Sequence, residues 1–77
     1  MHMPQDELTP SQSIGQRIRD ERYRQGLTQE QLAMISNVAT RSLHRIETGE
    51  AKVRFDVLVR ILAALGLEIE LRRRGER

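Results

Sequence analysis

The sequence contains no cysteine, and this absence excludes a disulfide framework, a thiolate nucleophile and a zinc site built on cysteine. No apolar run approaches the roughly 20 residues that a transmembrane helix needs. No signal peptide opens the chain, so we expect a cytosolic protein that is not bound to a membrane.

Groups suited to catalysis or metal binding are also scarce. The two histidines are His2, which lies in a polar segment at the start, and His44; neither has a nucleophile or a metal partner at ligand spacing. The chain has no Gly-rich phosphate-binding loop. We therefore expect no enzyme activity, no cofactor and no metal site.

Lysine is limited to Lys52, although Lys and Arg together number 13 and the formal net charge is +2. Arginine therefore carries nearly all the positive charge, and its guanidinium group suits bidentate contact with guanine and phosphate. An ordinary solvated surface fits this composition equally well. With 77 residues the chain forms one mostly α domain of four or five short helices, whose small core predicts help from a partner.

The stretch from Thr28 to Gly49 predicts two short helices joined by a tight turn. Thr28 and Gln31 form a capping box, which starts the first of these helices. Asn37 then tolerates the left-handed backbone of a sharp turn at a helix end.

The second helix of this pair is expected over about residues 39–48. Its inward side carries Val38, Leu43 and Ile46, and Gly49 ends it. Its outward face holds hydrogen-bonding and cationic side chains, namely Thr40, Arg41, Ser42, His44 and Arg45. Such a face suits a helix that reads DNA base edges and phosphates, whereas the alternative is a helical hairpin packed for stability alone.

An earlier helix is expected from Thr9-Pro10, a capping hydroxyl followed by a proline, to Gln25. Ile14 and Ile18 form its inward row, and Arg22 continues that row. A buried arginine needs a carboxylate partner, unless its side chain extends to solvent.

The last helix is expected over residues 55–65, after a connector at 50–54 that carries Lys52 and Arg54. Its apolar stripe is broad, and we expect part of it to face a second subunit. The stripe consists of Phe55, Leu58, Ile61, Leu62 and Leu65.

After Gly66 apolar residues alternate with charged ones, which predicts a β-strand over residues 67–72. A lone strand leaves its backbone groups unpaired, so we expect Leu67, Ile69 and Leu71 to pair with a second copy in a homodimer. Centring the pairing on Ile69 or on Glu70 remains open, and a frayed tail is the alternative. The expected organisation is a disordered lead (1–8), a helical domain (9–66), this strand (67–72) and a basic tail (73–77).

The central motif resembles the helix-turn-helix of phage-repressor-type (Xre, Cro/CI) proteins. The resemblance rests on Thr28-Gln29, Leu32-Ala33, Val38, Leu43 and Ile46-Glu47-Thr48-Gly49, and it extends from about Ile14 to Gly66. The chain departs from the family pattern at Asn37, where glycine is usual, and at Ala39, where serine or threonine usually caps the recognition helix.

The resemblance implies a sequence-specific repressor that binds double-stranded DNA as a homodimer on an inverted-repeat operator. It also implies an ion pair between Arg22 and Glu47. We expect Thr40, Arg41 and Arg45 to approach base edges. Contacts with phosphates are expected from Gln29, Ser42, His44 and Lys52.

The ending from Ile61 to Leu71 resembles that of HipB-type antitoxins, in which a strand pairs across the dimer. This implies a bacterial, cytoplasmic and nucleoid-associated protein that represses its own toxin–antitoxin operon and binds a HipA-like kinase. A stand-alone Xre-type regulator and a protein-interaction module without DNA binding are the alternatives.

Overall fold

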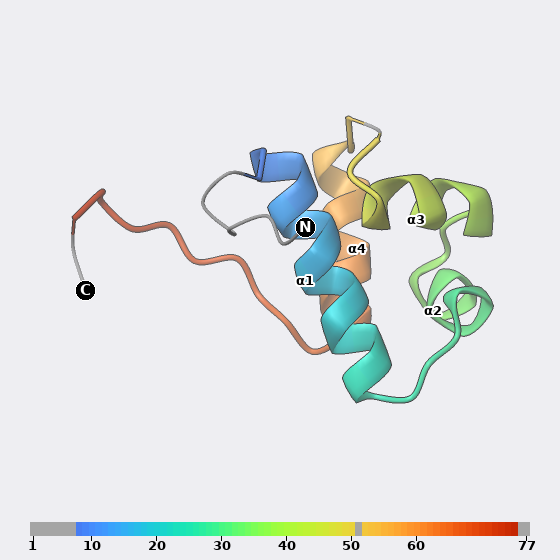
Figure 1. The fold of residues 1–77 in the computed structure, drawn as a ribbon. Coiled ribbons are helices and arrows are strands. Elements are labelled where there is room, and N and C mark those ends of the chain that lie inside the picture. The colour runs from blue at the N-terminus through green and yellow to red at the C-terminus, as the bar shows by residue number, and fades with distance from the viewer. Residues whose placement is uncertain (1–7, 51, 76–77) are drawn as a thin grey trace.

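The computed structural model describes residues 8–50 and 52–75, and these residues form four helices. The helices are α1 (Pro10–Arg24), α2 (Gln29–Ser36), α3 (Thr40–Glu47) and α4 (Phe55–Ala64), as Figure 1 shows. The mostly α fold expected from the sequence is thereby confirmed. Most of the expected disordered lead lies outside the described residues. No helix within the described part is long and apolar enough to cross a membrane.

Local hydrogen bonding explains where the first two helices begin and where α2 ends. Thr9 and Thr28 each accept a bond from the backbone N–H three residues later, and the glutamine at that position bonds back to the threonine N–H. Asn37 adopts the left-handed backbone at the end of α2, with a φ of 58°. The turn between α2 and α3 therefore uses the conformation that asparagine tolerates best among residues with a side chain.

The core lies where the four helices meet. Its fully buried side chains are Ile18, Leu32, Leu43 and Ile61, one from each helix. α1 packs against α3, and α2 packs against both α3 and α4. This arrangement fixes α3 from one side only, so its other side faces outward (Figure 1).

One glycine sets how closely α1 approaches α3. A Cβ atom at Gly15 would lie 2.2 Å from the backbone oxygen of Ile46. Because such an approach is far below van der Waals contact, only glycine lets α1 cross the end of α3 at this distance.

Ile14, expected in the inward row, is 38% exposed. Its side chain borders an apolar groove of about 520 Å³ between α1, α4 and the C-terminal segment, and does not lie in the core. The expectation was wrong because Gly15, and not Ile14, occupies the crossing of α1 with α3.

The expected strand over residues 67–72 is not seen. In the described part of the chain, residues 67–73 have no regular secondary structure, and Figure 1 shows them leaving the helical body on the side away from α2 and α3. A strand that pairs across a two-fold axis needs a second chain to supply its hydrogen bonds. The pairing therefore stays a prediction.

Candidate nucleic-acid interface

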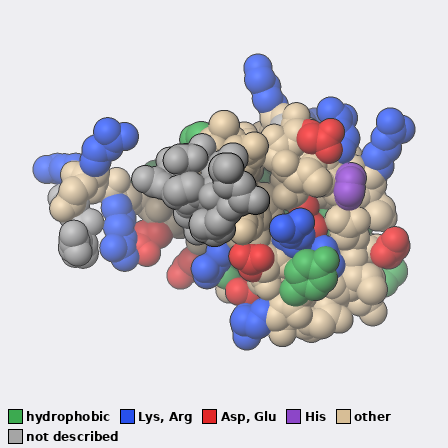
Figure 2. All heavy atoms as spheres, in the orientation of Figure 1, with side chains coloured by type: hydrophobic (Ala, Val, Ile, Leu, Met, Phe, Trp, Pro, Cys, Tyr) green, Lys and Arg blue, Asp and Glu red, His purple; other side chains and the backbone are tan. Residues whose placement is uncertain are grey.

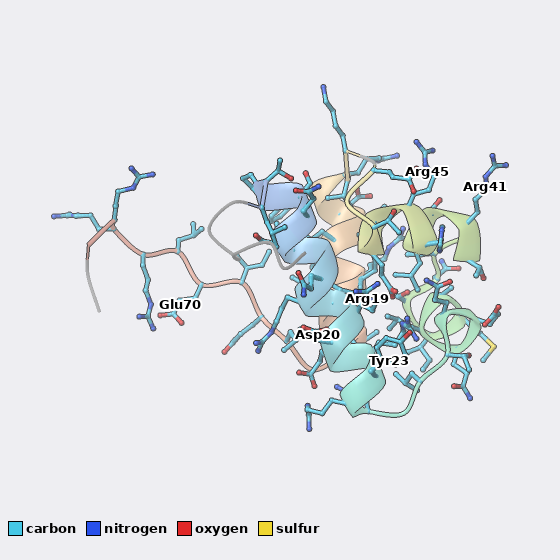
Figure 3. The ribbon with its side chains drawn as sticks, in the orientation of Figure 1. Arg19, Asp20, Tyr23, Arg41, Arg45 and Glu70 are labelled. Carbon is cyan, nitrogen blue, oxygen red and sulfur yellow. The ribbon has the colours of Figure 1, made fainter. Side chains whose placement is uncertain are left out.

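The outward face of α3 carries the side chains expected to contact DNA. Leu43, Ile46 and Glu47 are buried against the body, whereas Thr40 is half-buried. The remaining members of the expected set on α3 are exposed: Arg41, Ser42, His44 and Arg45. Figure 3 shows Arg41 and Arg45, which are one helical turn apart, both extending from α3 away from the rest of the molecule.

The N-terminus of α3 has no side-chain cap. Ala39 occupies the capping position and makes no side-chain hydrogen bond there. The first backbone N–H groups of a helix need partners, and the helix dipole makes this end positive. The first turn of α3, with Arg41 beside it, is therefore suited to an anionic partner.

The connector after α3 adds positive charge to the same side. A shallow hollow of about 200 Å³ is lined by Arg45 from α3 and by Lys52 and Arg54 from the connector, together with Ser42. Figure 2 shows Lys and Arg side chains gathered along the edge formed by α3 and the connector. This clustering gives a chain of small net charge a local cationic surface.

A buried ion pair supports α3 from behind. Arg22 Nε donates to Glu47 Oε2 at 2.7 Å, and Arg22 Nη2 donates to Glu47 Oε1 at 2.9 Å. Both residues are almost fully buried, with 5% and 4% of their surface exposed. The hydrogen bonds to Glu47 raise the pKa of Arg22 above its ordinary value. The pair ties the last turn of α1 to the last residue of α3.

Gln29, at the start of α2, lies against α3. Its Nε2 atom is 3.1 Å from Glu47 Oε1 and 3.4 Å from His44 Nδ1. The side chain is half-buried at the edge of a polar hollow of about 490 Å³ between α1, α2 and α3. Its expected contact with a phosphate stays a prediction.

Two residues of α1 that sequence reasoning did not select line the same hollow. Arg19 and Tyr23 border it together with Gln29 and His44, and Figure 3 shows both side chains on the side of α1 that faces α2 and α3. Arg19 is one turn before Arg22, so helical spacing from the buried arginine is the signal that would have found it.

The residues expected at a dimer interface lie away from α3. Leu67 is half-buried against the core, whereas Ile69 is 43% exposed and Leu71 is 92% exposed. Leu67 and Ile69 line the apolar groove between α1 and α4.

No group of three or more His, Cys, Asp or Glu residues within the described ranges could hold a metal ion. The outward face of α3 offers hydrogen-bond donors, acceptors and cations to a ligand.

Comparison with known proteins agrees with this geometry. Residues 13–75 match the family model described as "Helix-turn-helix domain". The fold is similar to that of the restriction-modification controller protein C.AhdI from Aeromonas hydrophila, with a TM-score of 0.72 and 31% sequence identity over 75% of this chain and 88% of that chain. No curated protein matches the sequence. Because the family model covers most of the chain, from within α1 to beyond α4, with α2 and α3 as the helix pair and α3 outward, the chain belongs to the helix-turn-helix domain family.

Proposed function

We propose that the protein is a sequence-specific DNA-binding regulator that represses transcription as a homodimer. The observation that carries this proposal is the outward face of α3, where Arg41 and Arg45 project together from a helix with an uncapped N-terminus. Arginine makes bidentate contacts with guanine in the major groove, and a helix of this kind fits that groove. The family assignment and the likeness to C.AhdI support the coarser part of the proposal, a DNA-binding regulator.

The roles of individual side chains follow from their positions. Thr40, Arg41 and Arg45 would approach base edges, because they lie on the outward face from the first turn of α3 onward. Ser42, His44 and Lys52 would contact phosphates at the flanks, and Gln29 would do so through its backbone N–H group at the start of α2. Arg54 is added to this set because it lines the hollow beside Arg45.

The surface that favours a homodimer lies on another side of the molecule from the outward face of α3. An apolar groove between α1 and α4 is open, and the exposed side chains near it include Phe55 at 70% and Val59 at 41%. A second copy would cover this surface with Ile69 and Leu71 of its own C-terminal segment. A two-fold dimer binds an inverted repeat.

Two biological settings fit such a regulator. The ending from Ile61 to Leu71 favours an antitoxin that represses a toxin–antitoxin operon and binds a HipA-like kinase in the bacterial cytoplasm. The likeness to C.AhdI, a restriction-modification controller protein, favours a stand-alone regulator. Co-expression with the product of the neighbouring gene separates them, since an antitoxin would co-purify with its toxin and a stand-alone regulator would not.

A salt-dependent gel shift with the DNA upstream of the gene tests the DNA-binding proposal itself. We expect a discrete complex whose affinity falls steeply as salt rises, because phosphate contacts release counterions. An excess of unrelated DNA should compete poorly. Absence of binding at low salt would instead favour a protein-interaction module.

A further inference from the structure

The side-chain amide of Gln29 lies between two acceptors, and one of them fixes its orientation. Gln29 Nε2 is 3.1 Å from Glu47 Oε1. Glu47 is 4% exposed and holds two hydrogen bonds from Arg22, so its side chain is a buried, ion-paired carboxylate. Because a carboxylate only accepts, the amide must turn its NH2 group, and not its oxygen, toward Glu47.

The same NH2 group also faces His44. Gln29 Nε2 is 3.4 Å from His44 Nδ1, and an amide nitrogen can donate but cannot accept. His44 Nδ1 must therefore accept, which leaves the ring proton of the neutral imidazole on Nε2. The tautomer of an exposed histidine on α3 is thus set by a buried carboxylate through one glutamine.

We propose that Gln29 and Glu47 are positioning residues for His44, holding its imidazole as the Nε2–H tautomer so that α3 presents an N–H donor to DNA. This inference rests on the proposed DNA-binding function and deepens it. Phosphate oxygens accept hydrogen bonds and cannot donate them. With Nδ1 paired to Gln29, only the Nε2–H form has a ring nitrogen left that can donate to a phosphate of the DNA backbone.

The positioning runs through three helices. Arg22 of α1 holds Glu47 at the end of α3, and Glu47 orients the amide of Gln29 at the start of α2. That amide in turn contacts the ring of His44 on α3. Arg19 and Glu30 are the other charged groups that line this hollow, and no hydrogen bond joins either of them to the His44 ring among the described residues. The glutamine is therefore the group that distinguishes the two ring nitrogens.

The test is the tautomer of His44 in the free protein. A His2→Gln background leaves His44 as the single histidine, and long-range proton–nitrogen correlation spectra then assign its tautomer. The spectra are recorded at a pH high enough that raising it further no longer changes them, so that they report the neutral imidazole. We expect the Nε2–H pattern in this background.

Gln29→Glu should reverse the tautomer, because a carboxylate at position 29 can only accept a hydrogen bond and therefore favours the form of His44 with its ring proton on Nδ1. Gln29→Met, which neither donates nor accepts strongly, should leave a mixture. Gln31→Glu is the matched control: it makes the same change two residues along on α2, and glutamate preserves the capping box with Thr28. It should keep the Nε2–H form.

An Nδ1–H form in the parent protein, or spectra that are the same for the parent and Gln29→Glu, would overturn the inference. Amide spectra and melting curves of each variant establish that it is folded. In DNA titrations Gln29→Met should weaken binding about 3- to 10-fold, the effect of one lost hydrogen bond. Because the tautomer is measured without DNA, a failure of the proposed function would appear only in the titrations of the parent protein.

Discussion

At the scale of single residues, Glu47 connects the stability of the fold to the surface of α3. Its carboxylate accepts from Arg22 through both oxygens and from Gln29 through one of them. A buried charge is tolerated only when such partners surround it. Changes at Glu47 should therefore be felt in both folding and DNA binding.

Replacing Glu47 with glutamine should lower the free energy of unfolding by about 3 to 5 kcal/mol, because it leaves Arg22 as an uncompensated buried cation. Denaturant unfolding followed by circular dichroism measures the change. Glu50→Gln is the control, since Glu50 is exposed and its loss should alter stability by less than about 1 kcal/mol. Equal stability of Glu47→Gln and wild type would show that the pair contributes nothing to the fold.

Gly15→Ala makes the opposite kind of change, an addition of one methyl group. The new Cβ would meet the Ile46 backbone oxygen at 2.2 Å, so α1 and α3 would have to separate. We expect a loss of about 1 to 3 kcal/mol of stability from overpacking, although alanine favours helix by about 1 kcal/mol over glycine. Thermal unfolding beside a Gln16→Ala control would measure it, and a stabilised Gly15→Ala protein would contradict the close approach.

At the scale of elements, α3 divides its two sides between different tasks. Its inner side supplies Leu43 and Ile46 to the core, while its outer side carries the two arginines of the proposed interface. The helix has only eight residues and no side-chain cap, so packing against α1 and α2 stabilises it more than its own sequence does. A rigid support of this kind is what a helix inserted into a groove requires.

Substitutions on α3 and in the connector after it should distinguish contacts with DNA bases from contacts with DNA phosphates. Arg41→Ala or Arg45→Ala should each weaken binding by about 1 to 3 kcal/mol and relax base preference, because a bidentate contact is lost. Lys52→Ala should weaken all sequences alike and reduce the salt slope by roughly one unit. Fluorescence anisotropy with operator and scrambled duplexes at several salt concentrations distinguishes the two patterns. Unchanged operator affinity in both arginine variants would refute the assignment.

Sequence patterns predicted the helices because the signals that start and stop them are local. Hydrogen bonds within a few residues determine the backbone conformation at the threonine caps, Thr9 and Thr28, and at the turn residue Asn37. The pairing of Arg22 with Glu47, implied by the family resemblance, is a contact in this structure. The caps and the turn need little knowledge of the rest of the fold, whereas the ion pair joins two helices and was expected from the resemblance.

The other features that depend on contacts between distant segments were not predicted. The role of Gly15 follows from where α3 ends against α1, and the exposure of Ile14 follows from the same crossing. The placement of Arg19 beside Gln29 and His44 requires three helices in their final positions. The alternating pattern of residues 67–72 indicates a strand only if a second chain pairs with it, which no single-chain pattern can establish.

At the scale of the whole molecule, two surfaces of different chemistry lie on different sides. The cationic face of α3 and the connector is on one side, while the apolar groove of α1 and α4 adjoins the C-terminal segment that extends away from α2 and α3 (Figures 1 and 2). A dimer formed through the groove would leave both α3 faces free. Two recognition helices about 34 Å apart could then enter successive major grooves of one DNA face.

Leu71→Lys tests this assembly with little effect on the single chain, because Leu71 is 92% exposed there. If its side chain is covered by the partner copy, a buried unpaired cation should move the sedimentation of the protein from dimer to monomer at micromolar concentration. Binding to an inverted repeat should then weaken by at least about tenfold, while binding to a single half-site should change little, since the α3 face is untouched. Met34→Lys, at a 75% exposed position on α2 that does not line the groove, is the matched control and should remain dimeric.

A chain truncated after Leu67 keeps the half-buried leucine that packs on the core and removes Ile69 and Leu71 together. If that chain still sediments as a dimer and binds the inverted repeat as tightly as the full protein, the C-terminal segment is not what joins the subunits.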